Sequence, residues 1–510
     1  MADGKINRPY GGVLLLGIFL TPLLSLGHDY ADGIITAKYF RFAEVVGIGL
    51  LLTWMVAWKR NFQFCFRWVD VGVVLFALYG VGSFLLNDFR GETQTLLLIL
   101  LVGLYFVCRG LGGWKVSQRL LFTFVLLLAG SIEAIWGFLQ VYGWADQYHS
   151  LYRLTGSFFN PGPYSGFLAV ILPVALHTLL GPKPLCRVDK IVYGLGVICL
   201  VSIILVLPAG MSRSAWVAAG AGCGVVVWRQ KRSREYVRRG IGRIGRGWKR
   251  YWLGGILLLG LSIGGGLYLL KKDSADGRLL VWKMDLAVMR SQPWLGIGIG
   301  RYPGALGEAQ AVYFANSPAD PREEYVADAP EYGFNEFLQL GGEYGLIGLC
   351  LFISITGIAS GGLFKRNTQQ TGGVSGALSA FLVFACFSYP LHMLPMAMLF
   401  VLLLAWSVNV GAKGVRIRRW AGQILWLPVM VLGLVAAWRL TEKETAYKTW
   451  KTARAYFRQG DYQEALNRYT PLALLVRCVT VLPIIMPIKN LWILFLEYRQ
   501  LGMRQYLCME

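Results

Sequence analysis

Three arginines stand close to the ends of long apolar segments: Arg153, Arg213 and Arg278. A cation at a membrane boundary is costly unless its side chain reaches lipid headgroups or pairs with an anion. Guanidinium groups bind phosphate oxygens in a bidentate manner, so arginines that share one site would bind a diphosphate. Each arginine taken alone is equally consistent with an ion pair to a loop carboxylate or with contact to headgroups. Their occurrence at three separate boundaries favours a shared anion site.

Each arginine belongs to a short block that is rich in glycine, aromatic residues or serine. The first block also contains Asn160, the third contains Trp282, and a fourth, without arginine, contains Asn335 and Glu336. A carboxylate such as Glu336 can accept a proton from a hydroxyl group. The blocks span residues 152–161, 212–216, 277–282 with 293–300, and 332–339 with 342–348.

The elements that must position these blocks are membrane helices. Of the 510 residues, 55% are hydrophobic and only 15% are charged, which is too little charge for the surface of a soluble protein. Apolar runs near the length that crosses the bilayer recur along the chain, and lipid-exposed backbone must form helices. The sequence predicts an all-α polytopic membrane protein with about 12–13 transmembrane helices. The predicted spans are 11–27, 39–58, 69–86, 93–108, 120–141, 163–180, 191–208, 213–228, 251–270, 342–363, 374–390, 393–410 and 421–439.

The distribution of lysine and arginine predicts the orientation of these helices. Alternate short loops are basic, as expected of the cytoplasmic side, and the run 229–250 is the most basic of them. The net charge of +22 therefore needs no nucleic-acid partner. With the N-terminus inside, the outer segments are 142–162, 209–212, 271–341 and everything after 440, and all four blocks lie on the outer side.

The predicted spans divide the chain into four regions. Residues 1–270 and 342–440 hold the transmembrane helices. Residues 271–341 are polar and contain ten of the 28 acidic residues, which predicts one large outer loop. Residues 441–510 form an outer tail, whose first part resembles a tetratricopeptide unit of two amphipathic helices around Gly460-Asp461.

Other motifs have a structural interpretation. The nine cysteines include no C-x-x-C pair, and the histidines have no metal-binding spacing, so no metal and no cofactor is expected. The run Gly296-x-Gly298-x-Gly300 lacks nucleotide-binding spacing and indicates a turn or a close backbone approach. Glu133 lies within a predicted span, where a functional role and a structural pairing are both open.

Taken together, the four blocks resemble the O-antigen ligase and polymerase family, which includes bacterial protein O-oligosaccharyltransferases. The resemblance rests on R-x-x-G-x-F-x-N-P at 153–161, S-R-S/T-x-W at 212–216, R-x-x-x-W at 278–282 with P-x-x-G-x-G at 293–298, and N-x-x-L-Q from Asn335 with E-x-G-x-x-G at 343–348. It implies a bacterial inner-membrane protein whose large loop and C-terminus are periplasmic.

One position departs from the family pattern. The family has histidine before the asparagine, and this chain has Phe334. The identity of any general base is therefore open, with Glu336, Glu331 and His149 as candidates from their chemistry.

The reaction that the resemblance implies is transfer of an oligo- or polysaccharide from an undecaprenyl diphosphate carrier to an acceptor hydroxyl. Arg278, Arg213, Asn335 and Glu336 would be catalytic, and Arg153, Asn160 and Trp282 would bind substrate. The acceptor remains open between lipid A core, a growing glycan and a protein, and membrane lipid is the other expected partner. The alternative function is a secondary transporter or flippase of lipid-linked glycan, although no paired broken helices are evident. A scaffold that recruits envelope enzymes through its tail is a third hypothesis.

Overall fold

The computed structural model describes most of the chain. The described residues are 10–27, 34–59, 65–87, 91–110, 116–149, 151–182, 184–230, 272–316, 320–328, 330–366, 368–409, 415–416 and 419–477. The predicted span 251–270, nearly all of the basic run 229–250 and the tail beyond 477 lie outside these ranges.

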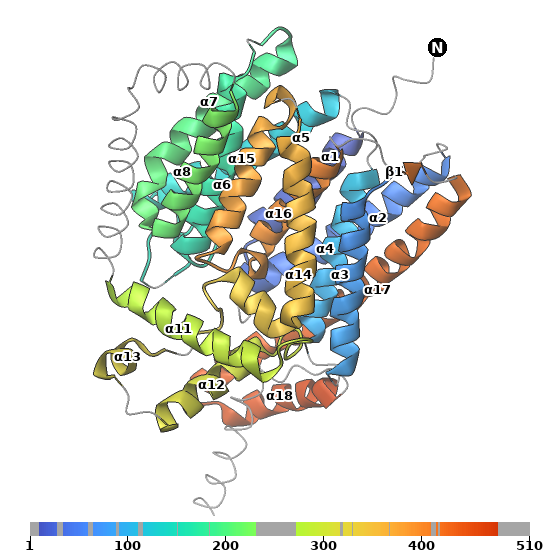
Figure 1. The fold of residues 1–510 in the computed structure, drawn as a ribbon. Coiled ribbons are helices and arrows are strands. Elements are labelled where there is room, and N and C mark those ends of the chain that lie inside the picture. The colour runs from blue at the N-terminus through green and yellow to red at the C-terminus, as the bar shows by residue number, and fades with distance from the viewer. Residues whose placement is uncertain are drawn as a thin grey trace, which may run out of the picture.

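The described residues are almost entirely helical, as the recurrent apolar runs predict (Figure 1). The helices up to the polar segment are α1 Tyr10–Leu24, α2 Ile34–Lys59, α3 Trp68–Leu86, α4 Glu92–Gly110, α5 Val116–Val141, α6 Pro161–Leu180, α7 Arg187–Val206, η1 Pro208–Gly210 and α8 Arg213–Arg229. The remaining helices are α11 Lys272–Ser291, α12 Tyr302–Asn316, α13 Pro321–Val326, α14 Glu336–Phe364, α15 Thr368–Ala385, η2 Pro390–His392, α16 Leu394–Asn409, α17 Arg419–Arg458 and α18 Tyr462–Arg477. Two short strands, β1 Cys65–Phe66 and β2 Val415–Arg416, pair antiparallel.

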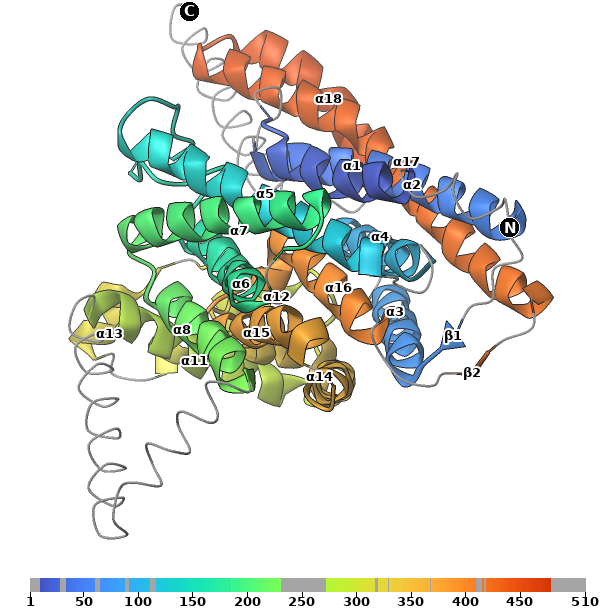
Figure 2. The same cartoon turned by 90° about the horizontal axis from the view of Figure 1, so that it is seen from above.

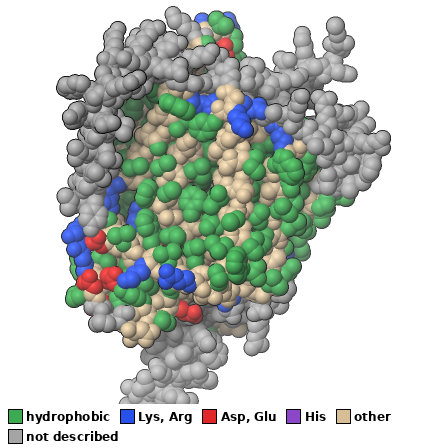
Figure 3. Space-filling view, in the orientation of Figure 1, with side chains coloured by type: hydrophobic (Ala, Val, Ile, Leu, Met, Phe, Trp, Pro, Cys, Tyr) green, Lys and Arg blue, Asp and Glu red, His purple; other side chains and the backbone are tan. Residues whose placement is uncertain are grey.

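The predicted fold class, an all-α polytopic membrane protein, is confirmed. Among the described residues, six helices are long and apolar enough to cross a membrane, and three shorter helices are also apolar. On the face shown in Figure 3, hydrophobic side chains cover the middle, while Lys, Arg, Asp and Glu gather toward the two ends. Such a belt is what the hydrocarbon core of a bilayer requires.

The polar segment predicted as a loop folds into helices that lie across one end of the bundle. Helices α11, α12 and α13 run beneath the long helices in Figure 1, and the β1–β2 pair lies at the opposite end. We call these the α11 end and the β1 end. Helix α11 buries Leu280, Met284 and Val288 in a small hydrophobic cluster with residues of α12. The segment is therefore a packed helical cap on the bundle.

Helix α14 begins inside the same polar segment and is kinked. Gly345 has φ 63°, which divides the helix after its first turns. The glycine run fits against this kink: Ile297 N–H donates to the Gly342 carbonyl at 2.9 Å, and Gly298 N–H donates to the Glu343 carbonyl at 3.0 Å. A side chain at Gly296 would collide with the α14 backbone. The run is thus a close backbone approach, as its spacing indicated.

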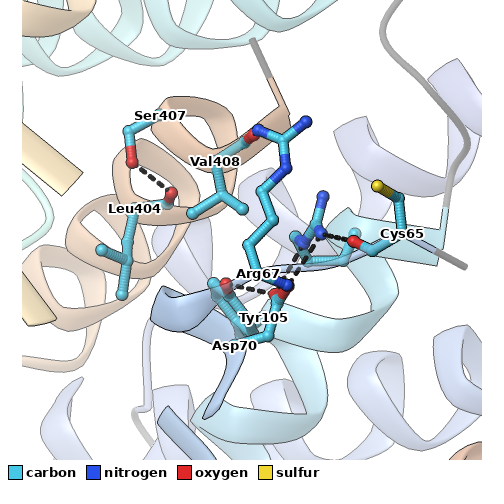
Figure 4. Close-up of polar contacts among 8 residues, drawn as sticks. Cys65, Arg67, Asp70, Tyr105, Leu404, Ser407 and Val408 are labelled. Atoms are coloured by element: carbon cyan, nitrogen blue, oxygen red, sulfur yellow. Dashed lines mark hydrogen bonds and ion pairs between the residues drawn. The ribbon is translucent and has the colours of Figure 1, made fainter. Parts of the chain in front are cut away.

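A buried polar cluster joins helices at the β1 end (Figure 4). Arg109 of α4 forms an ion pair with Asp70 of α3 at 2.8 Å, and the Tyr105 hydroxyl donates to the same carboxylate at 2.6 Å. Arg67 donates to the carbonyl of Val408 at the end of α16. These contacts fix α3, α4 and α16 relative to one another.

A second buried bridge pins the loop that precedes α6. The Glu133 carboxylate of α5 accepts a hydrogen bond from the Ser157 backbone N–H at 2.9 Å. The Lys38 ammonium of α2 donates to the Ser157 hydroxyl at 3.3 Å and to the carbonyl oxygens of Pro22 and Leu23 at the end of α1. Glu133 therefore has a structural pairing, the second of the two roles that its sequence position left open.

The C-terminal described region is a helix pair. Helix α17 continues without interruption from the predicted span to Arg458, and α18 returns along it after the turn at Gly460 (Figure 2). Ala453, Ala465 and Tyr469 form the buried contact between the two helices. The likeness to a tetratricopeptide unit remains a prediction.

Candidate functional site

Arg213 and Arg278 come from different helices, α8 and α11, and lie near enough for their charges to interact. Burial lowers the pKa of the Arg278 guanidinium, the positive charge of Arg213 lowers it further, and Tyr389 acts in the opposite direction. Arg278 donates a hydrogen bond to the Phe387 carbonyl at 3.0 Å, and among the described residues it forms no ion pair. Two neighbouring guanidinium groups repel each other. A doubly charged anion bound between them would relieve this repulsion and would itself be stabilised.

Phe334 covers this arginine. Its ring centre lies 5.2 Å from the guanidinium carbon of Arg278 and 5.4 Å from the ring of Tyr389. Its backbone has φ 50°, a left-handed conformation that is unfavourable for a bulky residue and is typically retained only where the surroundings enforce it. The residue that departs from the family pattern is therefore part of the arginine site, where it supplies an aromatic face rather than a proton acceptor.

Asn335 and Glu336 have definable structural roles. The Asn335 side-chain oxygen accepts hydrogen bonds from the N–H groups of Phe337 and Leu338, at 3.1 and 3.2 Å, so it caps α14. Glu336 is fully buried, and its carboxylate accepts a hydrogen bond from the Leu391 N–H at 2.9 Å. Together they hold η2 against the beginning of α14.

His392 completes a buried group of charges beside Glu336. Its Nδ1 lies 3.1 Å from the Glu336 carboxylate, within ion-pair distance, and its Nε2 lies 3.9 Å from Glu343. Burial lowers the pKa of His392, but the two carboxylates outweigh it and raise the pKa to about 10. Gln339 accepts a hydrogen bond from the Gly333 N–H and places its amide nitrogen 2.9 Å from Nε2. The two carboxylates thus favour a charged imidazole at neutral pH, with Glu336 facing its Nδ1.

Asp285 is a buried carboxyl on the face of α11 that carries Arg278. It accepts a hydrogen bond from the Tyr302 hydroxyl, and its other oxygen has no hydrogen-bond partner within the described ranges. Burial raises the pKa of Asp285 to about 7, although the Tyr302 hydroxyl acts to lower it. Gly333 lies directly against this pair, and a side chain there would meet both Tyr302 and Asp285.

We expect Asp285→Asn to raise the thermal unfolding temperature at pH 8. The pKa of Asp285 is higher in the folded state than in the unfolded state, so the protonated carboxyl stabilises the folded protein. This contribution to the free energy of unfolding is complete below about pH 4 and is lost as the pH rises to about 7. Each unit of this shift is worth about 1.4 kcal/mol, and asparagine carries no charge at any of these pH values. The measurement is the unfolding temperature of the purified protein between pH 4 and 8. The exposed Asp273 at the start of α11 gives the control, Asp273→Asn, whose unfolding temperature should follow the wild type over this pH range because Asp285 is retained. A variant that is less stable than the wild type at pH 8 contradicts the expectation.

Residues 198–353 match the family model described as O-antigen ligase. The chain therefore contains a segment similar to O-antigen ligase over these residues. No curated protein matches the chain. With the apolar helices, the O-antigen ligase domain indicates a multi-pass bacterial membrane protein with a role in polysaccharide assembly.

The O-antigen ligase domain contains most of the site. It begins in α7, ends in α14 and includes Arg213, Arg278, Phe334 and Glu336. Trp282 also lies within it, one helical turn after Arg278, with its ring 6.4 Å from that of Phe387. Trp282 therefore borders the arginine pair, as its spacing on one helix face predicts.

The two remaining predicted residues precede the O-antigen ligase domain. Asn160 caps α6 by accepting a hydrogen bond from the Gly162 N–H at 2.8 Å. Arg153 is exposed in the preceding loop, where His149, one of the candidate bases, accepts a hydrogen bond from the Leu151 N–H. Within the part of the chain that the structure describes, no hydrogen bond or ion pair joins these residues to the arginine pair. Glu331, the other candidate base outside α14, is exposed.

Sequence reasoning missed His392 and Asp285 as members of the site. His392 was recognisable only as a histidine near the outer end of a span, and no spacing rule links it to Glu336, which is 56 residues away along the chain. Asp285 had a usable signal, since it follows Arg278 by seven residues and therefore shares its helix face.

Proposed function

We propose that the protein transfers an oligo- or polysaccharide from a polyprenyl diphosphate carrier to an acceptor hydroxyl. The observation that carries the proposal is the pair Arg213 and Arg278, brought together from α8 and α11 within the O-antigen ligase domain. The alternation of basic loops supports placing the α11 end in the periplasm and the bundle in the inner membrane. Lipid A core, a growing glycan and a protein hydroxyl all remain candidate acceptors.

In the proposed reaction the acceptor oxygen forms a bond to the anomeric carbon of the donor sugar. The bond from that carbon to the diphosphate oxygen breaks, the carrier leaves as the diphosphate, and the proton of the acceptor hydroxyl passes to the leaving diphosphate or to solvent, so no nucleotide is required. Negative charge accumulates on the departing oxygen, and the two guanidinium groups would stabilise it. Trp282 and Phe334 would border the donor sugar.

Asn335 and Glu336 act in this proposal by positioning. Asn335 begins α14, and Glu336 holds Leu391 and His392, so the pair keeps the Gly333–Phe334 turn over Arg278. Their substitution is expected to alter the placement of Phe334 and thereby the access to the arginines.

The deciding experiment is reconstitution of the full-length protein in liposomes with a synthetic polyprenyl diphosphate glycan on the outside. A hydroxyl acceptor is added, and the covalent product and the released carrier diphosphate are measured by mass spectrometry. Formation of both in equal amounts supports the transferase. Movement of intact donor to the other leaflet without a covalent product would instead support the flippase alternative and overturn the proposal.

A further inference from the structure

A cavity of about 260 Å³ lies between α3, α4, α14 and α16, apart from the arginine pair. Its walls are apolar, with Leu97 and Leu101 from α4, Phe352 from α14 and Phe400 from α16. The residues that line it on α4 run from Gln94 to Tyr105. At 1.5 Å per residue this is about 16 Å, roughly half of the hydrocarbon core of a bilayer.

The two ends of the cavity differ in polarity. At the β1 end it is lined by Leu404 and by Tyr105, whose hydroxyl is bound to Asp70 (Figure 4). At the α11 end it is lined by Glu336, Glu343 and His392. A narrow apolar cavity with a single polar end would fit an amphiphile. The aliphatic chain of the amphiphile would lie in the cavity, and its headgroup would lie at the α11 end.

The charges at the polar end select against phosphate. Two carboxylates face one imidazolium there, and no lysine or arginine is among the lining residues. A phosphate or diphosphate would meet net negative charge in a poorly solvated site, which is unfavourable. An uncharged hydroxyl can donate to Glu343 and needs no counter-ion.

The aromatic residues beside the cavity indicate that an amphiphile in the cavity and a diphosphate at the arginine pair would occupy separate places. Tyr332 lines the cavity and stacks on Tyr389 at 4.2 Å, and Tyr389 packs on Phe334, which covers Arg278. The cavity and the arginine pair thus contact opposite members of one aromatic group.

The cavity volume is below the usual range of about 300–1,000 Å³ for ligand pockets, which suits one aliphatic chain and not a two-chain phospholipid.

We propose that this cavity binds a single-chain lipid alcohol, with its aliphatic chain between α4 and α16 and its hydroxyl beside Glu343 and His392. Both a prenyl alcohol and a monoacylglycerol combine one aliphatic chain with an uncharged hydroxyl headgroup. The site does not depend on the proposed glycan transfer, because it uses neither arginine.

The test is photo-crosslinking on the full-length protein in lipid nanodiscs, with three probes of similar chain length: a photoreactive C15 prenyl alcohol, its diphosphate and a photoreactive monoacylglycerol. We expect the alcohols to label peptides of α4 and α16 at least fivefold more than the diphosphate does. The more strongly labelling alcohol identifies the source of the chain. Stronger labelling of these peptides by the diphosphate would overturn the proposal.

Matched tryptophan variants on α3 test whether labelling reports the cavity. Val73 lines the cavity, whereas Val71, two residues earlier, is 36% exposed on another face of the helix. Val73→Trp should reduce alcohol labelling at least fivefold, and Val71→Trp should leave it within twofold of the wild type. Equal labelling of the two variants refutes the site. If Val73→Trp does not fold, Ala397→Phe, which fills the cavity from α16, replaces it.

Glu343→Gln tests the headgroup argument without changing the shape of the cavity. Loss of one negative charge should raise diphosphate labelling at least fivefold and leave alcohol labelling within twofold. Unchanged exclusion of the diphosphate would show that charge does not select the ligand, and would overturn that part of the proposal. Labelling needs no glycan donor, so a failed transfer assay would not affect the labelling test. A failed labelling test would likewise leave the proposed glycan transfer untouched.

Discussion

Replacing Arg278 by alanine is expected to lower the rate of glycan transfer by about 10²–10³-fold, the usual cost of removing one preorganised group that stabilises developing negative charge. Arg278 is buried enough that its pKa falls, it lies beside Arg213, and within the described residues no carboxylate pairs with it. Its charge is therefore available to an anion. Because that interaction strengthens as the diphosphate departs, kcat should fall more than KM rises.

The measurement is the initial rate of product formation by the reconstituted protein over a range of donor concentrations. Arg290→Ala is the matched control, since Arg290 is exposed as the penultimate residue of the same helix and should retain the wild-type rate. Arg278→Lys should give an intermediate rate, because an ammonium keeps the charge and loses the bidentate geometry. A folded Arg278→Ala protein with normal transfer would refute the role assigned to the arginine pair.

The transmembrane part of the fold was predictable because it depends on local composition. Apolar runs of about 20 residues must be helical in lipid, and the predicted spans within the described ranges each fall on a helix. The end of α17 was not predicted. The span was expected to end at 439 and a separate helix to begin near 446, yet no proline follows Pro428 before Gly460, and the helix continues to Arg458. Loss of hydrophobicity ends a span without ending a helix.

The site was predictable only in part because it is made by contacts between distant segments. Sequence placed Arg213 and Arg278 on the same side of the membrane, but their proximity depends on how α11 crosses the end of the bundle (Figure 1). The catalytic role expected of Asn335 remains a prediction, and the capping of α14 by its side-chain oxygen was not foreseen. The His392 contact with Glu336 arises where η2 packs on α14, and no local pattern encodes that packing.

The second large effect is expected at the Lys38–Ser157–Glu133 bridge. Lys38 and Glu133 are both buried, and each binds Ser157 from a different helix. Removal of one charge from a buried pair leaves the other without compensation, which costs about 3–5 kcal/mol. We therefore expect Glu133→Gln and Lys38→Met each to reduce the free energy of unfolding by about that amount.

A double-mutant cycle separates this coupling from the loss of either side chain alone. Lys38→Met with Glu133→Gln removes both charges, so the double variant should lose clearly less than the sum of the single losses. The measurement is thermal unfolding of the purified protein in one detergent. Glu44→Gln is the matched control on α2, because Glu44 pairs with Arg41 at the surface and such pairs contribute only about 0–1 kcal/mol. Additive losses in the double variant would mean that the two buried charges are not coupled. Coupled losses would identify the bridge as the contact that holds the 152–160 loop to α2 and α5.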